Sequence, residues 1–250
     1  MNVLTFYFSG SGNTEWVVRR WDGMLKGNGH TSRIAAVEAV DMAAFVRDLP
    51  GAFDCIGFAY PVYAADIPRS MFGAIRGFAE AASARPDVAK NLFIINTFAY
   101  VNALGIFGAR KLFRGTPFRV RSLLNVKMIN SAPRKKAKDL TGPDEARKRN
   151  AQRQLAAFLK RMEHGKNRVE GVGPQLLGGK LVRALLRRPI QNNYRRMRVD
   201  PQVCTGCMLC VRECPTHSIR YENPAFTFAD TCEACMRCYH HCPVRAITNG

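Results

Sequence analysis

Eight of the nine cysteines in this 250-residue chain fall into two copies of one spacing, C-x2-C-x2-C-x3-C-P. The first copy comprises Cys204, Cys207, Cys210 and Cys214 followed by Pro215, and the second comprises Cys232, Cys235, Cys238 and Cys242 followed by Pro243. Steps of three residues let a short loop aim three sulfur atoms at one point, and a cuboidal iron–sulfur centre needs several such soft thiolates. The proline then ends each loop. The pattern therefore predicts two 4Fe–4S clusters.

Zinc and disulfide bonds are the alternative uses of closely spaced cysteines. A zinc ribbon needs only four ligands, so it would leave the third cysteine and the Cys-Pro of each copy without a role. A disulfide framework requires an oxidising compartment, whereas residues 1–9 are typical of a strand, with neither the basic start nor the cleavage site of a secretory signal. Iron is therefore the favoured occupant.

The two cysteine copies resemble the ligand run of bacterial ferredoxins, in which three close thiolates bind one cluster and the fourth crosses to the other. The resemblance implies one cluster on Cys204, Cys207, Cys210 and Cys242, and a second on Cys232, Cys235, Cys238 and Cys214. Because the copies are offset by 28 residues, we expect a small pseudo-twofold domain, each half a short hairpin and a turn of helix.

A different motif lies near the start of the chain. Residues 3–8 form an unbroken run of apolar and β-branched residues, typical of a strand buried on both faces of a parallel sheet, and a helical stretch follows from residue 15. Glycines and short polar side chains join the two, namely Ser9, Gly10, Ser11, Gly12, Asn13 and Thr14. Such a loop can approach an anion closely and donate hydrogen bonds to it, and the helix N-terminus adds free N–H groups. The motif predicts a phosphate site, the alternative being a plain strand-to-helix turn; no Lys-Ser or Lys-Thr follows, which excludes a nucleoside-triphosphate loop.

Strand-like and helix-like stretches alternate through residues 1–164, which predicts a doubly wound α/β sheet. Further strands are expected at 32–37, 53–59, 91–97 and about 123–129, and helices at 12–27, 68–82, 103–114 and 144–164. Cys55 lies inside an expected strand, so we interpret it as a core residue. Aromatic loops follow two strands: Tyr60, Pro61, Val62 and Tyr63, and then Thr97, Phe98, Ala99 and Tyr100. Ligands of open α/β sheets bind at this edge.

The loop at residues 9–14 is similar to the flavodoxin phosphate loop, and the two aromatic loops occupy the places where flavodoxins grip the flavin ring. The order of parts resembles the flavodoxin–ferredoxin fusions called EFR1 family ferredoxins. The resemblance implies a flavodoxin-like doubly wound parallel sheet at 1–164, a basic connector at 165–197, and a small α+β ferredoxin domain at 198–250. It implies FMN on Ser9, Ser11, Gly12, Asn13, Thr14 and the two aromatic loops.

Residues 110–197 carry 24 Lys and Arg against 5 Asp and Glu. The excess of positive charge in this segment equals the formal net charge of the whole chain, +19. Such a surface can steer an acidic redox protein, such as a ferredoxin-like donor or acceptor. Within it, residues 180–190 predict a basic amphipathic helix, which we expect to dock on the flavin domain instead of a membrane surface. The basic runs 134–138 and 147–149 raise nucleic-acid binding as an alternative, but no nucleic-acid fold accompanies them.

No apolar run is long enough to cross a bilayer, so a soluble cytoplasmic protein is expected.

Flavin exchanges one or two electrons and each cluster exchanges one, so the three together predict an electron-transfer protein of the oxidoreductase class. An FMN-dependent reductase of a small-molecule substrate is the alternative. The sequence contains no acid–base grouping of His, Asp and Tyr that would indicate a substrate, and the five histidines are scattered. The catalytic residues, if any, are therefore left open by the sequence.

Overall fold

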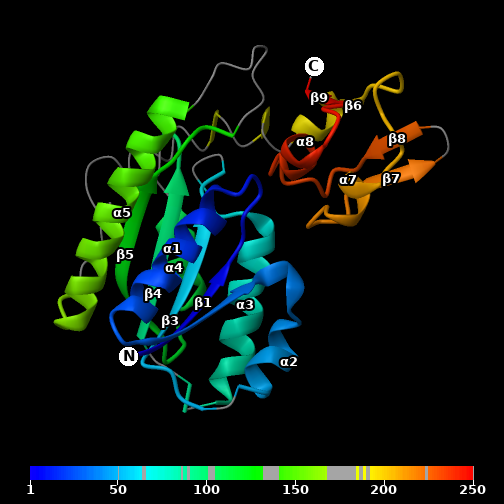
Figure 1. Ribbon diagram of the computed structural model, residues 1–250. Coiled ribbons are helices and arrows are strands. Elements are labelled where there is room, and N and C mark those ends of the chain that lie inside the picture. The colour runs from blue at the N-terminus through cyan, green and yellow to red at the C-terminus, as the bar shows by residue number, and fades with distance from the viewer. Residues whose placement is uncertain are drawn as a thin grey trace.

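The structure, a computed structural model, describes residues 1–49, 51–63, 66–85, 87–88, 91–100, 105–131, 141–167, 184–185, 188–189, 192–222 and 225–249. A layered α/β part comes first in the chain, and a smaller part lies beside the top of its sheet (Figure 1).

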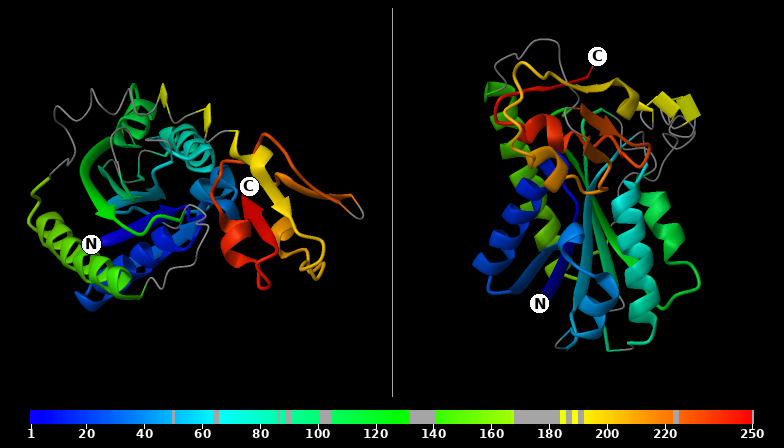
Figure 2. Two further views of the ribbon diagram at one scale, coloured as in Figure 1. Left: turned by 90° about the horizontal axis from the view of Figure 1, so that it is seen from above. Right: turned by 90° about the vertical axis from the view of Figure 1, so that its right-hand side faces the viewer.

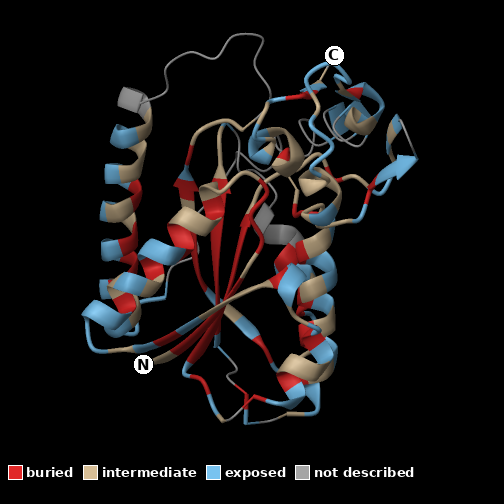
Figure 3. Ribbon diagram, turned by 45° about the vertical axis from the view of Figure 1, so that its right-hand side comes forward, coloured by how far each residue is buried: buried red, intermediate tan, exposed pale blue. Residues whose placement is uncertain are grey.

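Five parallel strands form the sheet of the first part: β1 (Asn2–Tyr7), β2 (Thr31–Ala36), β3 (Cys55–Pro61), β4 (Asn91–Phe98) and β5 (Arg119–Lys127). Their order is β2-β1-β3-β4-β5, which is the flavodoxin-like doubly wound order. The central strands are buried along almost their whole length (Figure 3), because helices cover both faces of a parallel sheet. The predicted fold class is confirmed.

Two helices, α1 (Asn13–Gly27) and α5 (Thr141–Glu163), cover one face of the sheet. The other face is covered by α2 (Met42–Arg47), α3 (Arg69–Ser83) and α4 (Gly105–Leu112), as the two views of Figure 2 show. Phe6, Phe58 and Phe78 form an aromatic centre under α3, with ring centroids 5.3–5.9 Å apart. Trp21 fills the α1–α5 side between Phe93 and Phe158. These two cores fix the loops that leave the upper edge of the sheet.

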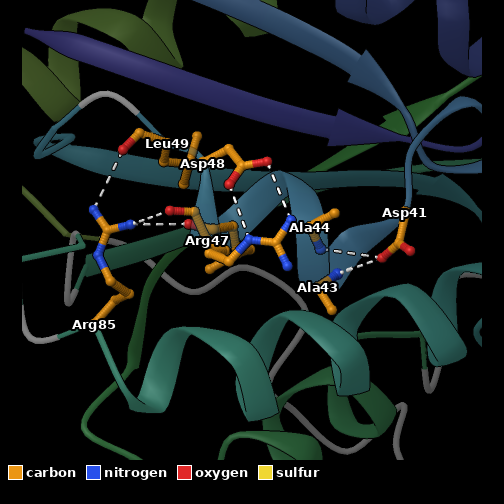
Figure 4. A network of polar contacts seen from close by, with 8 residues as sticks. Asp41, Ala43, Ala44, Arg47, Asp48, Leu49 and Arg85 are labelled. Carbon is orange, nitrogen blue, oxygen red and sulfur yellow. Dashed lines mark hydrogen bonds and ion pairs between the residues drawn. The ribbon is translucent and has the colours of Figure 1, made fainter.

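Helix α2 was not predicted from the sequence, and a network of polar contacts explains why it forms (Figure 4). The Asp41 carboxylate accepts hydrogen bonds from the backbone N–H groups of Ala43 and Ala44 at 3.0 and 3.1 Å, which caps the N-terminus. The Arg85 guanidinium donates to three carbonyl groups at the opposite end, those of Val46, Arg47 and Leu49. A six-residue helix depends on such tertiary contacts, because isolated short helices are marginal.

The second part contains three-residue and four-residue strands and two short helices. They are β6 (Met197–Val199), α7 (Leu209–Arg212), β7 (Ile219–Glu222), β8 (Ala225–Phe228), α8 (Arg237–His241) and β9 (Ile247–Asn249). A 3-10 turn, Asn193–Arg196, precedes them. The expected 28-residue repeat recurs in the backbone, since left-handed residues fall in pairs with that offset: Gly206 and Ala234, Met208 and Met236, and His217 and Arg245. Antiparallel pairing of β6 with β9 and of β7 with β8 then joins the two halves.

The expected amphipathic connector helix lies mostly outside the described residues. Only 184–185 and 188–189 of the stretch 180–190 are described, and all four are exposed. The basic run 134–138 also lies outside them. In the part of the chain that the structure describes, no helix has the length and apolarity to cross a membrane.

Candidate cofactor sites at the upper edge of the sheet

Two small cavities in the second part are each lined by four cysteines. One is lined by Cys204, Cys207, Cys210 and Cys242, and the other by Cys214, Cys232, Cys235 and Cys238. Each cavity therefore takes three cysteines from one copy and the fourth from the other. The exchange follows from the strand pairing, because β9, which comes after Cys242, pairs with β6, which precedes Cys204.

Backbone geometry positions these sulfur atoms. Met208 and Met236, both in the left-handed conformation, directly precede α7 and α8, so the third cysteine of each copy lies in the first turn of a helix. The fourth cysteines accept N–H bonds at matching places, Cys214 from Ser218 at 3.3 Å and Cys242 from Ala246 at 3.2 Å. Hydrogen bonds to cluster sulfurs are one of the means by which proteins tune cluster potentials.

The cysteine cavities fit a four-iron cluster in the chemistry of their donors. Each cavity brings four thiols together, and in the part of the chain that the structure describes no three His, Cys, Asp or Glu side chains are placed to hold a single metal ion. A four-iron cluster holds its thiolates farther apart than one zinc ion does. Burial raises the pKa of the Cys235 thiol and raises that of Cys238 to about 12, so cluster binding must release protons from these groups.

The loop between β1 and α1 has the features of an anion cradle. Gly12 precedes α1 in the left-handed conformation (φ 89°), and no side chain caps the helix. The Ser9 hydroxyl is buried without a hydrogen-bond partner among the described residues. Thr14 and Thr97 join their hydroxyl groups at 2.7 Å, which ties the loop to the end of β4. An orphaned buried hydroxyl and an uncapped helix N-terminus fit a phosphate group.

A segment that the sequence analysis missed, residues 129–131 after β5, also contacts this loop. The Asn13 amide donates to the Ile129 carbonyl at 3.0 Å and to the Ser131 hydroxyl at 2.9 Å, and Ser11 contacts Ser131 as well. The signal in the sequence was positional, because this segment follows a strand that ends at the same edge of a parallel sheet. Ser11 and Asn13 thus have protein partners, whereas Ser9 has none among the described residues.

The two aromatic loops lie side by side, joined by a 2.8 Å hydrogen bond from the Val62 N–H to the Thr97 carbonyl. Their aromatic side chains differ in exposure. Tyr60 is fully buried in the core, so its ring is not at the surface of the edge. Tyr63 is half-buried with its hydroxyl beside the Cys235 loop, and its pKa is raised by burial and then by the Cys235 side chain. Phe98 is half-buried and Tyr100 is 73% exposed, so these two remain accessible. Pro61 and Ala99 are half-buried.

The second part packs on this edge through residues of the second cysteine copy. Arg237 donates to the Ser9 carbonyl at 2.7 Å and forms an ion pair with Glu38. Glu233 accepts hydrogen bonds from the Ser70 N–H at 3.1 Å and from the Ser70 hydroxyl at 2.8 Å. Burial raises the pKa of Glu233, and the Ser70 hydrogen bonds oppose that rise.

Gly10 marks the closest approach of the two parts. A Cβ atom at this position would overlap the Cys235 carbonyl oxygen and the Tyr63 hydroxyl, and would lie 2.8 Å from the Cys235 Cβ. Only a glycine leaves room for the cysteine loop here. The loop with the phosphate-site features and the second cysteine copy are therefore in direct contact.

Cys55, the ninth cysteine, is separate from both cavities and lies in the sheet core. Burial raises the pKa of its thiol from 9.0 to about 12, so at pH 8 it is neutral in the folded protein. We expect iodoacetamide to leave Cys55 unmodified at pH 8 and to modify it after denaturation, because the thiolate is the nucleophile. Peptide mass spectrometry measures this, and rapid modification of Cys55 in the folded protein would contradict its burial.

Comparison with protein families matches the cysteine-rich part of the chain. The family model described as "4Fe-4S dicluster domain" matches residues 203–247. No curated protein matches the chain.

Among solved structures, the chain is similar to a flavodoxin from the domain Archaea (9% identity, TM-score 0.45, 66% of this chain and 100% of that one). It is also similar to oxidised Flavodoxin 1 from Bacillus cereus (14%, 0.44, 64% and 98%). A third similar structure is the rubredoxin oxygen:oxidoreductase of Desulfovibrio gigas (12%, 0.46, 65% and 36%), so the match spans little more than a third of that protein.

Proposed function

We propose that this protein is an electron-transfer iron–sulfur flavoprotein, in which two 4Fe–4S clusters and one FMN exchange electrons within one chain. The observation that carries the proposal is the direct packing of the Cys235 loop on Gly10 in the loop at residues 9–14. Clusters exchange one electron at a time, and flavins exchange one or two. The order of parts further supports membership of the EFR1 family of flavodoxin–ferredoxin fusions.

The FMN phosphate would be held at the N-terminus of α1 by Ser9, Ser11, Gly12, Asn13 and Thr14. The aromatic loops, with Tyr63, Phe98 and Tyr100, would flank the ring system. When bound, FMN supplies the group that accepts one or two electrons. The chain itself orients the phosphate through the helix N-terminus and the Ser9 hydroxyl, and the second part covers one side of the loop.

Cofactor analysis of anaerobically purified protein tests this proposal. We expect about eight irons and eight sulfides per chain, together with one FMN. Replacing Thr14 with glutamate should abolish FMN retention, because a buried carboxylate would repel the phosphate, whereas Thr31→Glu at the exposed start of β2 should retain it. Stoichiometric zinc in place of iron, or unchanged FMN content in Thr14→Glu, would overturn the proposal.

One observation favours the second candidate, a flavin-dependent reductase of a small molecule. A cavity of about 440 Å³ lies between the two parts, beside Ser9, Gly10 and Gly12, and Tyr7, Glu38 and His241 contribute to its wall. Its volume is in the range of small-molecule sites. Anaerobic reoxidation of the reduced protein by a panel of small electron acceptors, with saturation at low concentration, would support this activity.

An acidic redox protein is the partner that the charge of the chain favours. On the exposed face of α5, Arg149, Arg153 and Lys160 carry positive charge. The second-order rate of reduction by an acidic ferredoxin-like donor should fall steeply with salt, because the Debye length shrinks from about 10 Å at 0.1 M to about 3 Å at 1 M. Replacing the three residues with glutamate should flatten this dependence while internal transfer stays unchanged. A salt-independent rate in the unmodified protein would refute steering, and tight binding to anionic vesicles would then favour a membrane surface.

A further inference from the structure

We propose that the two clusters work in a fixed order, which rests on the proposed function above. The cluster on Cys214, Cys232, Cys235 and Cys238 exchanges electrons with FMN, and the cluster on Cys204, Cys207, Cys210 and Cys242 exchanges electrons with the external partner. The repeat makes the two sites equivalent in ligands, so their order must come from their surroundings.

The loops of the two copies differ in exposure. In the first copy, residues 205–207 are all exposed, including Cys207. In the second copy, the equivalent residues 233–235 are buried or half-buried, and Cys235 packs against the core of the α/β part. The loop of the second copy therefore faces the sheet edge that carries the loop at residues 9–14, and the loop of the first copy faces solvent.

The residues that make this contact are particular to the second copy. Glu233, which binds Ser70, corresponds to Thr205 at the 28-residue offset, and Arg237, which binds the Ser9 carbonyl, corresponds to Leu209. Threonine has no carboxylate to accept both hydrogen bonds from Ser70. Leucine has neither the charge for an ion pair with Glu38 nor a donor for the Ser9 carbonyl. The two halves thus share their ligand pattern and differ in the side chains that dock.

With both cofactors bound, Cys214, Cys232, Cys235 and Cys238 would hold the cluster that gives one electron to the flavin, so that the cluster would be oxidised by one electron as the flavin is reduced by one. Cys204, Cys207, Cys210 and Cys242 would hold the cluster that passes one electron on to it. A reduced one-electron carrier protein supplies the next electron at the exposed loop 205–207. The reverse direction uses the same order of centres.

Glu233 and Arg237 act as positioning residues, and changing both tests the proposal without touching a cysteine. The pair Arg237→Leu and Glu233→Thr introduces the residue types of the first copy. Its control is Arg220→Leu and Glu222→Thr, which makes the same chemical changes at exposed positions of β7. Both proteins should keep all their iron and sulfide, because no ligand is altered.

In the docking pair, hydrogen exchange at the Ser70 N–H should be about tenfold or more faster, since the Glu233 carboxyl group that accepts its hydrogen bond is lost. Electron transfer from clusters to flavin, followed by stopped-flow absorbance, should slow while the initial reduction of the clusters by the donor protein is unchanged. The control pair should alter neither. An unchanged Ser70 exchange rate and an unchanged internal rate in the docking pair would overturn the proposed order.

Single-cluster variants identify which centre serves the flavin. Cys210→Ala should retain transfer to the flavin from the remaining cluster and lose rapid reaction with the donor protein. Cys238→Ala should lose transfer to the flavin, although the flavin remains reducible by dithionite. The opposite result would reverse the order. Absence of FMN or iron from the unmodified protein would overturn the proposed function as well, and composition shows this before any rate is measured.

Discussion

Replacing Cys214 with alanine is expected to remove the cluster of the second copy, about four of the eight irons, and to leave the cluster of the first copy in place. The reason is that Cys214 lines the cavity of Cys232, Cys235 and Cys238, although it follows Cys210 in sequence by only four residues. Iron and sulfide analysis, together with Mössbauer spectra of the remaining cluster, measures the result.

The matched control is Cys242→Ala, which occupies the same place in the other copy. It should remove the cluster of Cys204, Cys207 and Cys210, the cysteines with which it shares a cavity. The two variants therefore lose equal amounts of iron from opposite sites. Loss of the first-copy cluster in the Cys214 variant would show that each copy keeps its own fourth ligand.

Gly10→Ala is expected to separate the second part from the α/β part while both remain folded. Gly10 is not in the left-handed conformation, so alanine is compatible with its backbone. The added Cβ would overlap the Cys235 carbonyl and the Tyr63 hydroxyl, and such overpacking costs about 1–3 kcal/mol when it cannot be relieved. Undocking relieves it, so small-angle scattering should show a larger radius of gyration, and electron transfer from clusters to flavin should slow sharply.

Gly23→Ala is the control for this change. A Cβ at Gly23 meets nothing within 4 Å, and alanine in a helix is favoured over glycine by roughly 0.5–1 kcal/mol. This variant should be slightly more stable and scatter like the unmodified protein. A Gly10→Ala protein with unchanged scattering and unchanged transfer would mean that the cysteine loop adjusts without undocking.

The sequence predicted the strands well where both faces are buried, because a continuous apolar run has one main explanation. The last strand was expected from about residue 123, yet β5 begins at Arg119. Arg119 and Arg121 are exposed on this edge strand, so its first residues lack the apolar signal. Helix α2 was missed for a related reason, since Asp41 and Arg85 hold its ends through contacts that periodicity does not reveal.

For the candidate site, the sequence predicted the cysteine pattern and the loop at residues 9–14, but it did not predict the side-chain contacts between distant segments. The grouping of cysteines in the two cavities follows the ferredoxin-like pattern, and the loop at residues 9–14 lies where the strand order requires. Tyr60 is predicted to bind the cofactor, and the structure places its side chain in the buried core. Ser131, Glu38 and Arg237 took no part in the prediction, because their contacts join segments more than 100 residues apart in sequence.

The uneven distribution of apolar core between the two parts has a consequence for biogenesis. Strands β1 to β5 and helix α5 use residues 2–163 and bury two large cores, so this part can fold as it leaves the ribosome. Among the described residues of the second part, the buried apolar side chains are few, and Met197, Met236 and Ile247 form their cluster; so small a core usually needs a metal centre. Maturation would therefore proceed in stages: sheet first, iron–sulfur insertion next, and closure of Arg237 over Ser9 last. A cell short of iron would accumulate the chain with a folded α/β part and an unfolded cysteine-rich part, a form that proteases can recognise.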